Sequence, residues 1–190
     1  MVDVPEAVVL DRDDIARALT RIAHEIAERN AQAGGVAIVG IHRRGVHLAR
    51  RLQPQLSELL ASTRDGDGDV PLGSLDISFY RDDLGLRPEA PVVSGTQLEF
   101  AIDATTVVIV DDVLFTGRTV RSAIDALLEY GRPARVQLAV LVDRGHRELP
   151  IRPDYVGKNL PTARGERVNV RVSELDGVDA VTISTAAVLA

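Results

Sequence analysis

Two adjacent aspartates, Asp111 and Asp112, stand between an apolar run and a small-residue loop in the stretch TVVIVDDVLFTGRT. Ionised carboxylates only accept hydrogen bonds, so a close pair suits a vicinal diol, which offers two hydroxyl donors. The loop that follows consists of Thr116, Gly117, Arg118 and Thr119. Its glycine permits close backbone approach, and free amides at a helix start together with two hydroxyls can cradle a dianionic phosphate. A diol on the carboxylates and a phosphate on the loop together describe a ribose 5-phosphate.

The elements around this stretch must place the aspartates at the edge of a sheet. Residues 107–110 form a β-branched run that is typical of a strand buried on both faces of a parallel sheet. Ligands of open α/β sheets bind at the carboxyl ends of the strands, which is where Asp111 and Asp112 fall. A Walker A loop is excluded because its Gly-Lys-Ser/Thr ending is absent, and a Rossmann site because no strand precedes a G-x-G-x-x-G spacing.

Helical and strand patterns alternate along most of the chain. We expect helices at 11–30 and 46–60, and a third after Thr119, with strands at 36–40, 75–80, 107–110 and 136–142. Shorter strand-like pieces follow at 168–172 and 180–184, whereas 143–161 is rich in arginine, glycine and proline. This alternation predicts an α/β fold with a parallel, doubly wound sheet and right-handed crossovers.

Composition limits the remaining possibilities. A chain of 190 residues with 45% hydrophobic and 26% charged residues suits one domain over residues 1–190. The absence of cysteine excludes disulfides, thiol nucleophiles and thiolate metal sites, and it fits a reducing cytosol. The start lacks the pattern of a signal peptide and no apolar run reaches membrane-spanning length, so we expect a cytoplasmic protein without a membrane partner. The net charge of −6 argues against indiscriminate nucleic-acid binding, although basic residues gather between 118 and 171.

The stretch 106–119 resembles the phosphoribosyl-pyrophosphate (PRPP) motif of type I phosphoribosyltransferases. With ALTRIAHEI, DISFYRDDLG and VDRGHRELPIRPDYVGKNLPT, the chain resembles the PyrR family along its whole length. The resemblance implies a type I phosphoribosyltransferase fold: a doubly wound, mainly parallel sheet flanked by helices, with a small hood and a mobile flap. It also implies that Asp111 and Asp112 hold the ribose 2′ and 3′ hydroxyls, and that residues 116–119 hold the 5′-phosphate.

Members of that family bind pyr messenger RNA when loaded with uridine nucleotide, and many convert uracil and PRPP into UMP and pyrophosphate with Mg²⁺. The resemblance therefore implies PRPP, uracil, UMP or UTP and a pyr leader mRNA as partners. It further implies gene regulation at the level of transcription or translation. PRPP oxygens and water supply most of the magnesium ligands in type I enzymes, so we expect no dedicated metal site on the protein. We also expect a homodimer or a higher homo-oligomer.

The resemblance assigns three further parts of the site. The pyrophosphate loop would be Ile41, His42, Arg43, Arg44 and Gly45, and relatives often carry lysine where His42 stands. The flap would contribute Tyr80, Arg81 and Asp82. Uracil would lie near Val142, Asp143, Arg144, Gly145 and Val168. Taken alone, the two loop arginines also fit a solvated surface pair, and the flap segment also fits a plain exposed loop.

An RNA-binding surface is predicted from the first helix and a later loop. By helical geometry one exposed stripe carries Arg17, Thr20, Arg21 and His24, and the resemblance joins it to His146, Arg147 and Arg152. Aromatic residues make up only 3% of the chain, so recognition has to rest on arginine, histidine, hydroxyls and folded RNA shape. Taken alone, such a stripe is also typical of a solvated helix face. We predict that neutralising Arg147 weakens RNA binding and spares UMP synthesis.

Three functions fit these observations. The first is a bifunctional uracil phosphoribosyltransferase and RNA regulator. The second is a regulator whose phosphoribosyltransferase site serves mainly as a nucleotide sensor, with weak catalysis. The third is a purely metabolic phosphoribosyltransferase of the salvage pathway without an RNA partner.

Overall fold

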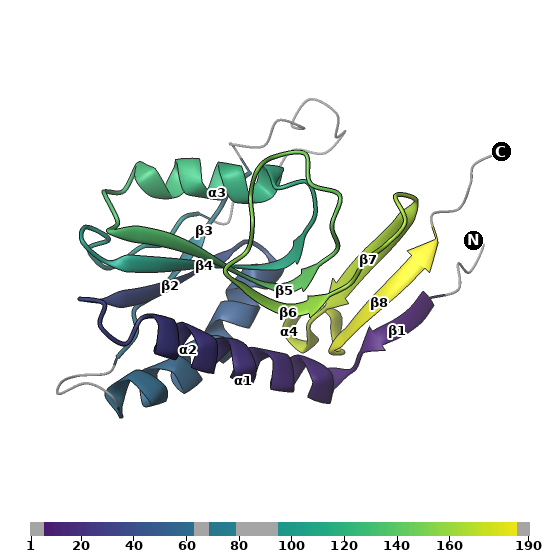
Figure 1. Ribbon diagram of the computed structural model, residues 1–190, viewed down its shortest axis with the longest axis horizontal. Coiled ribbons are helices and arrows are strands. Elements are labelled where there is room, and N and C mark those ends of the chain that lie inside the picture. Colours follow the sequence, from purple (N-terminus) through teal and green to yellow (C-terminus); the bar gives the residue numbers. More distant parts are fainter. Residues whose placement is uncertain (1–5, 63–68, 79–94, 186–190) are drawn as a thin grey trace.

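A computed structural model describes residues 6–62, 69–78 and 95–185 of the chain. Its centre is a five-stranded, fully parallel sheet in the order β3-β2-β4-β5-β6 (Figure 1). The strands are β2 (Val36–Ile41), β3 (Leu72–Leu75), β4 (Thr106–Leu114), β5 (Arg135–Asp143) and β6 (Tyr155–Asn159). Strand β3 lies on one side of β2, whereas β4, β5 and β6 follow in chain order on its other side, so the sheet is doubly wound, as predicted.

Helices cover both faces of this sheet. Helices α1 (Arg12–Arg29) and α2 (Arg44–Ala61) lie on one face, and α3 (Arg118–Leu128) lies on the other (Figure 1). Along β4, Val108 and Val110 belong to the core on the α1 and α2 side, whereas Val107 and Ile109 belong to the core beneath α3. Burial on both faces explains why the central strands are continuously apolar instead of alternating.

A small second sheet stands beside the main one and forms a hood. Its three antiparallel strands are ordered β1 (Glu6–Leu10), β8 (Ala180–Thr185) and β7 (Glu166–Arg171), with the short helix α4 (Ser173–Asp176) between β7 and β8. Figure 1 shows that this hood lies at one end of the main sheet and contains both described chain ends. The Glu6 carboxylate accepts a hydrogen bond from Arg171 at 2.7 Å, which fastens the first strand to the hood.

Most predicted elements are confirmed, but one predicted strand had the wrong bounds and two strands were not predicted. Helix α1 begins at a capping box formed by Asp11 and Asp14, and its buried stripe contains the apolar positions expected from the pattern. The third strand of the main sheet ends at Leu75, where 75–80 had been predicted, because its partner β2 ends at Ile41. Strands β1 and β6 were missed, since each is a short edge strand in a sequence with little apolar periodicity.

Candidate functional site

The paired carboxylates lie where the sheet begins to open. The pairing of β4 with β2 ends at Val110, and the next residue is Asp111, while pairing with β5 continues to Leu114. The strand thus extends past the aspartates, although it had been expected to end before them. The Asp111 carboxylate accepts from the Asp112 amide at 2.9 Å, and the Asp112 carboxylate accepts from the Val113 amide at 2.8 Å. Both side chains are therefore fixed at the switch point of the doubly wound sheet.

Burial sets the electrostatics of this pair. Asp111 is buried, and burial raises the pKa of the Asp112 carboxyl above the 3.8 of an unperturbed aspartate. A backbone hydrogen bond and the nearby Arg44 charge act in the opposite direction. The two carboxylates together form a strong hydrogen-bond acceptor site, and the positive charge of Arg44 favours ionisation of Asp112.

The predicted pyrophosphate loop comes directly against these carboxylates. A Cβ on Gly45 would lie 2.4 Å from the Val110 carbonyl oxygen and 3.3 Å from the Asp111 Cα, so only glycine lets the loop approach β4 this closely. The His42 amide donates to the Leu75 carbonyl at 2.9 Å, which ties the loop to β3 as well, and the His42–Arg43 peptide is cis. The structure therefore brings together two segments that are about 70 residues apart in the sequence.

The charged side chains of this loop have different surroundings. Arg43 is exposed, whereas Arg44 is partly buried and forms a bidentate ion pair with Asp176 of the hood, at 2.8 and 3.2 Å. Burial lowers the pKa of His42, with Asp76 acting against that shift and Arg50 and His47 adding to it. The loop thus presents one neutral imidazole at neutral pH and two guanidinium groups.

The predicted 5′-phosphate loop opens helix α3. Gly117 has φ +95° and stands at the helix start, and no described side chain caps it. The first helical hydrogen bond runs from the Arg121 amide to the Gly117 carbonyl at 3.0 Å, so the amides of Thr119 and Val120 have no acceptor within the helix. Such amides, with the Thr116 and Thr119 hydroxyls beside them, form the kind of cradle that binds phosphate.

A neighbouring loop fixes this cradle. The amides of Glu148 and Leu149 both donate to the Thr116 carbonyl, at 3.0 and 3.1 Å, and the Glu148 carboxylate pairs with Arg118 at 2.9 Å. Arg147 donates to the Phe115 carbonyl at 2.8 Å and to the Ile151 carbonyl at 3.0 Å, and it also pairs with Asp143. The guanidinium of Arg147 therefore joins the phosphate loop to the end of β5.

The predicted uracil region lies next to that junction. Val142 is buried in the core, and Val168 of β7 packs against the same core cluster. Asp143 accepts from the Gly145 amide at 2.9 Å, and the buried Arg144 donates to the Glu166 carbonyl at 2.8 Å. The Arg144 guanidinium also stacks on the Phe115 ring at 4.2 Å.

Phe115 was not predicted as a site residue. Its ring is 39% exposed and lies between the guanidinium of Arg144 and the imidazole of His146, whose ring centroid is 6.2 Å away. The Nε2 atom of His146 is in turn 2.5 Å from the Thr162 carbonyl. The available sequence signal was an aromatic residue directly before the phosphate loop.

The predicted RNA residues come from two parts of the structure, helix α1 and the segment that follows β5. The α1 stripe is exposed as expected. Arg21 donates to the β6 carbonyls of Val156 and Gly157, at 3.1 and 2.7 Å, so this guanidinium also braces the helix on the sheet edge. Arg152 is exposed but lines a hollow with Val120 and Ile124 beside α3, on the other face of the sheet. The Arg147 guanidinium already binds the Phe115 and Ile151 carbonyls and Asp143. Replacing it would therefore disturb the phosphate loop as well as any contact with RNA.

The predicted flap residues Tyr80, Arg81 and Asp82 lie outside the described residues. On either side of them, the Asp76 carboxylate accepts hydrogen bonds from the Ser78 amide at 2.9 Å and the Gly95 amide at 3.3 Å. Asp76 therefore holds the two described ends of this segment next to the end of β3.

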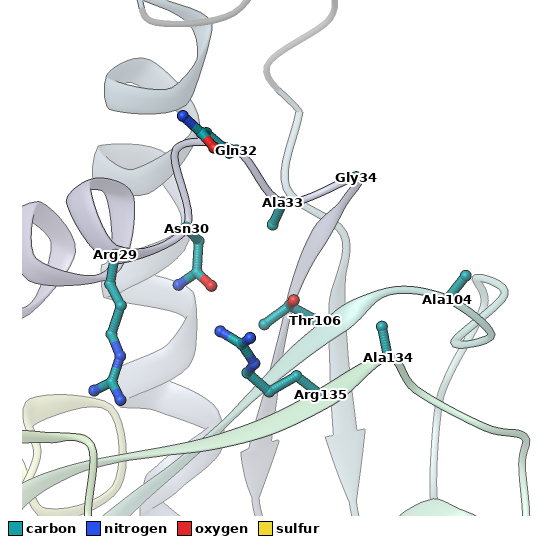
Figure 2. Close-up of a pocket in the computed structure, with 9 residues that line it drawn as sticks. All are labelled: Arg29, Asn30, Gln32, Ala33, Gly34, Ala104, Thr106, Ala134 and Arg135. Carbon is teal, nitrogen blue, oxygen red and sulfur yellow. The ribbon is translucent and has the colours of Figure 1, made fainter.

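A separate hollow of about 320 Å³ lies at the opposite edge of the sheet, at the amino ends of β2, β4 and β5. Figure 2 shows its lining, which contains two arginines and no acid: Arg29, Asn30, Gln32, Ala33, Gly34, Ala104, Thr106, Ala134 and Arg135. Because Asp111 and Asp112 lie in the carboxyl-terminal half of β4, this hollow is distinct from the site that they form.

No group of three or more histidine, aspartate or glutamate side chains in residues 6–62, 69–78 and 95–185 is arranged to hold a metal ion. None of the helices in the same ranges is long and apolar enough to cross a membrane.

Comparison with known proteins decides the family. The phosphoribosyl transferase domain family matches residues 8–174. "Bifunctional protein PyrR" of Roseiflexus sp. (strain RS-1) is 60% identical over 179 residues, which is 94% of each chain. The proteins of the same name from Acetivibrio thermocellus and Deinococcus radiodurans are 55% and 57% identical, over 95% and 93% of each chain. The chain belongs to the PyrR family of phosphoribosyltransferases.

Solved structures show that the fold of this PyrR-family chain is a type I phosphoribosyltransferase fold, as predicted. A hypoxanthine phosphoribosyltransferase from Trypanosoma cruzi superposes with a TM-score of 0.73 over 98% of both chains, at 19% identity. A hypoxanthine phosphoribosyltransferase from Staphylococcus aureus gives a TM-score of 0.67 over 97% of this chain and 93% of its own, at 21% identity. At this level of identity the likeness concerns the fold and carries no information on the base.

Proposed function

We propose that this PyrR-family chain is one domain with two functions. It makes UMP and pyrophosphate from uracil and PRPP, and it binds pyr leader mRNA under the control of uridine nucleotide. The observation that carries the enzymatic half is the convergence of three segments at one edge of the sheet. At this edge the carboxylates of β4 fit the diol of PRPP. The loop 41–45, packed on Val110, fits the pyrophosphate, and the uncapped start of α3 fits the 5′-phosphate of the same molecule.

The protein's part in this reaction is binding, orientation and charge stabilisation. Asp111 and Asp112 accept from the ribose hydroxyls and fix the sugar ring, while residues 116–119 fix the 5′-phosphate. The bond from C1 of the ribose to pyrophosphate breaks as the bond to uracil nitrogen forms, and the proton of that nitrogen leaves. Negative charge grows on pyrophosphate in the transition state, next to the guanidinium groups of Arg43 and Arg44.

Mg²⁺ is part of this proposal as a companion of PRPP. The carboxylate oxygens of Asp111 and Asp112 are the ligand type that Mg²⁺ takes, and they lie where the diol would lie, so they fit an ion shared with PRPP. When bound, the ion would neutralise charge on the pyrophosphate and favour its departure.

The enzymatic half is tested by measuring UMP formation from uracil and PRPP with Mg²⁺, with hypoxanthine in place of uracil as the matched control. We expect turnover with uracil and turnover at least about 100-fold slower with hypoxanthine, since a base that leaves buried polar groups unpaired is strongly rejected. Turnover with hypoxanthine and none with uracil would contradict the proposed base. PRPP binding without turnover on either base would favour the nucleotide-sensor function.

The affinity for PRPP is expected to depend on pH through Asp112. Because burial raises the pKa of this carboxyl, protonation should begin to weaken diol binding at a higher pH than an ordinary aspartate predicts. The same shift means that ionising Asp112 opposes folding, so its contribution to stability falls as pH rises above its unfolded-state pKa. PRPP affinity measured between about pH 4 and 8 should decline on the acid side in the wild type. Asp112→Asn should lack this decline, and identical profiles would contradict the assignment.

The regulatory half predicts that Arg17 contacts RNA. Its side chain is 69% exposed, and among the described residues it pairs with Asp14, one turn back, at 2.6 Å. Arg17→Gln should weaken RNA binding about tenfold and lower the slope of log affinity against log salt by about one. Arg12→Gln, an exposed arginine of the same helix outside the stripe, is the matched control. Equal effects of the two variants would show that the helix contributes only general charge.

A further inference from the structure

Arg44 joins the predicted pyrophosphate loop to the hood. It is the first residue of α2, and its Nη2 and Nε atoms donate to the two carboxylate oxygens of Asp176, at 2.8 and 3.2 Å. Both side chains are partly buried, with exposed fractions of 34% and 22%. The pair links residues that are 132 positions apart. A bidentate pair of this kind fixes the plane of the guanidinium as well as its position.

The acceptor is itself held in place. One Asp176 oxygen also accepts from the Val172 amide, at 2.9 Å, where β7 passes into α4. The hydrogen bonds from Arg44 and Val172 hold the pKa of Asp176 below its ordinary value, so the carboxylate is charged at neutral pH. Asp176 is thus a fixed anionic anchor.

A second arginine of α2 makes a similar attachment away from the loop. Arg51, seven residues after Arg44 and so on the same helix face, pairs with Glu174 at 2.5 Å and with Asp179 at 2.7 Å. The hood is therefore bound to α2 at two points. Of these two attachments, only the ion pair of Arg44 lies next to the Asp111 and Asp112 carboxylates of β4.

The pairing leaves donors available on Arg44. A guanidinium has five N–H groups, and Asp176 takes two of them from one side. The other three form no hydrogen bond within the described part of the chain, and Arg44 lies close enough to Asp112 for its charge to act on that carboxyl. The free side of the guanidinium is thus available to an anion next to the diol site.

We propose that Asp176 is a positioning residue, which orients Arg44 so that its three remaining N–H groups bind the pyrophosphate of PRPP. This inference rests on the proposed function of the same site. The hood would then have a role in substrate binding, because the contact of Asp176 in α4 with Arg44 sets the geometry of the pyrophosphate loop. Asp179, whose partners among the described residues are Arg51 and the Ser173 amide, would only attach the hood to α2.

The test compares Asp176→Asn with Asp179→Asn, each of which removes one hood carboxylate charge facing an arginine of α2. We expect Asp176→Asn to raise KM for PRPP about tenfold and to leave KM for uracil within about twofold, while Asp179→Asn changes neither by more than about twofold. Melting temperatures should fall by similar amounts in both variants. Asp176→Glu should recover part of the PRPP affinity, and Arg44→Lys should match Asp176→Asn because lysine cannot form a bidentate pair.

Non-additivity gives the second readout. In the double variant Asp176→Asn with Arg44→Lys, KM for PRPP should be no higher than in Arg44→Lys alone, because Asp176 acts only through the guanidinium. An unchanged KM for PRPP in Asp176→Asn would overturn the proposal. So would equal rises for PRPP and uracil in both asparagine variants, which would indicate a structural role. Failure of the wild-type protein to bind PRPP or to make UMP is a separate result, because it overturns the proposed function itself.

Discussion

Replacing Asp111 and Asp112 together by asparagine is expected to reduce UMP synthesis by about 10²- to 10⁴-fold. Each carboxylate offers a charge-assisted hydrogen bond worth about 1.5–3 kcal/mol, and each 1.36 kcal/mol corresponds to about a factor of ten in rate. Asparagine keeps the size of the side chain and can still accept from the Asp112 and Val113 backbone amides. It loses the charge, and its amide can turn a donor toward the ribose hydroxyls. Steady-state measurement of UMP formation checks this expectation.

Folding should survive this replacement, so the loss can be assigned to the site. Because burial raises the pKa of Asp112, removing its charge relieves a cost in the folded state, and the melting temperature at neutral pH should not fall. Asp125→Asn is the matched control, since Asp125 is an exposed carboxylate on α3 with only a loose partner, Arg121, at 3.6 Å. Retained UMP synthesis in the double variant would rule out the diol role of the pair.

Gly45→Ala is expected to reduce UMP synthesis by about 100-fold or more and to lower stability by about 1–3 kcal/mol. The added Cβ would lie 2.4 Å from the Val110 carbonyl oxygen, which belongs to the backbone of β4 and cannot rotate away. The loop 41–45 would have to move off the strand, and its guanidinium groups would move with it. UMP synthesis and thermal unfolding of the same preparation measure the two effects.

Gly34→Ala serves as the control for this substitution. Gly34 precedes β2 at the other end of the sheet, and a Cβ there would meet nothing within 4 Å. We expect wild-type turnover and a melting temperature close to that of the wild type. If Gly45→Ala also retained wild-type turnover, the close contact between the loop and β4 would be unnecessary for the reaction.

The sequence predicted those parts of the site that depend on neighbouring residues. An apolar strand, two aspartates and a glycine-containing loop form one continuous pattern. The structure places Gly117 at the start of α3 as that pattern requires, although β4 continues past Asp111 and Asp112 to Leu114. The family resemblance, rather than the pattern of residues, assigned residues 41–45 to the same site, and the structure packs Gly45 against Val110 of β4.

The partners of the arginines could not be predicted in this way. Arg44 pairs with Asp176, Arg147 donates to the Phe115 carbonyl, and Arg21 donates to the Gly157 carbonyl, at separations of 132, 32 and 136 residues. The sequence does not distinguish an arginine that faces solvent from one that binds RNA or a backbone carbonyl, because tertiary packing determines the partner of the guanidinium. The resemblance alone joined Arg152 to the α1 stripe, and in the structure Arg152 lies beside Val120 and Ile124 of α3.

The structure narrows the surface that we propose for RNA. Arg17, Thr20 and His24 are exposed on α1, while Arg147 is engaged near the phosphate loop. If one RNA contacts both the α1 stripe and the segment around Arg147, its affinity depends on the conformation of the loop that binds the 5′-phosphate. Nucleotide binding could then change RNA affinity by favouring one arrangement of that loop, which is the coupling that nucleotide-dependent regulation requires.

The most direct test of this account is the affinity of the purified protein for the leader RNA of its own organism's pyrimidine genes, measured with and without UMP at two salt concentrations. We predict binding below about 1 μM that is about fivefold or more tighter with UMP, and that weakens with salt. Absence of RNA binding in every state, from a preparation that makes UMP from uracil and PRPP, would contradict the regulatory function and leave a purely metabolic enzyme.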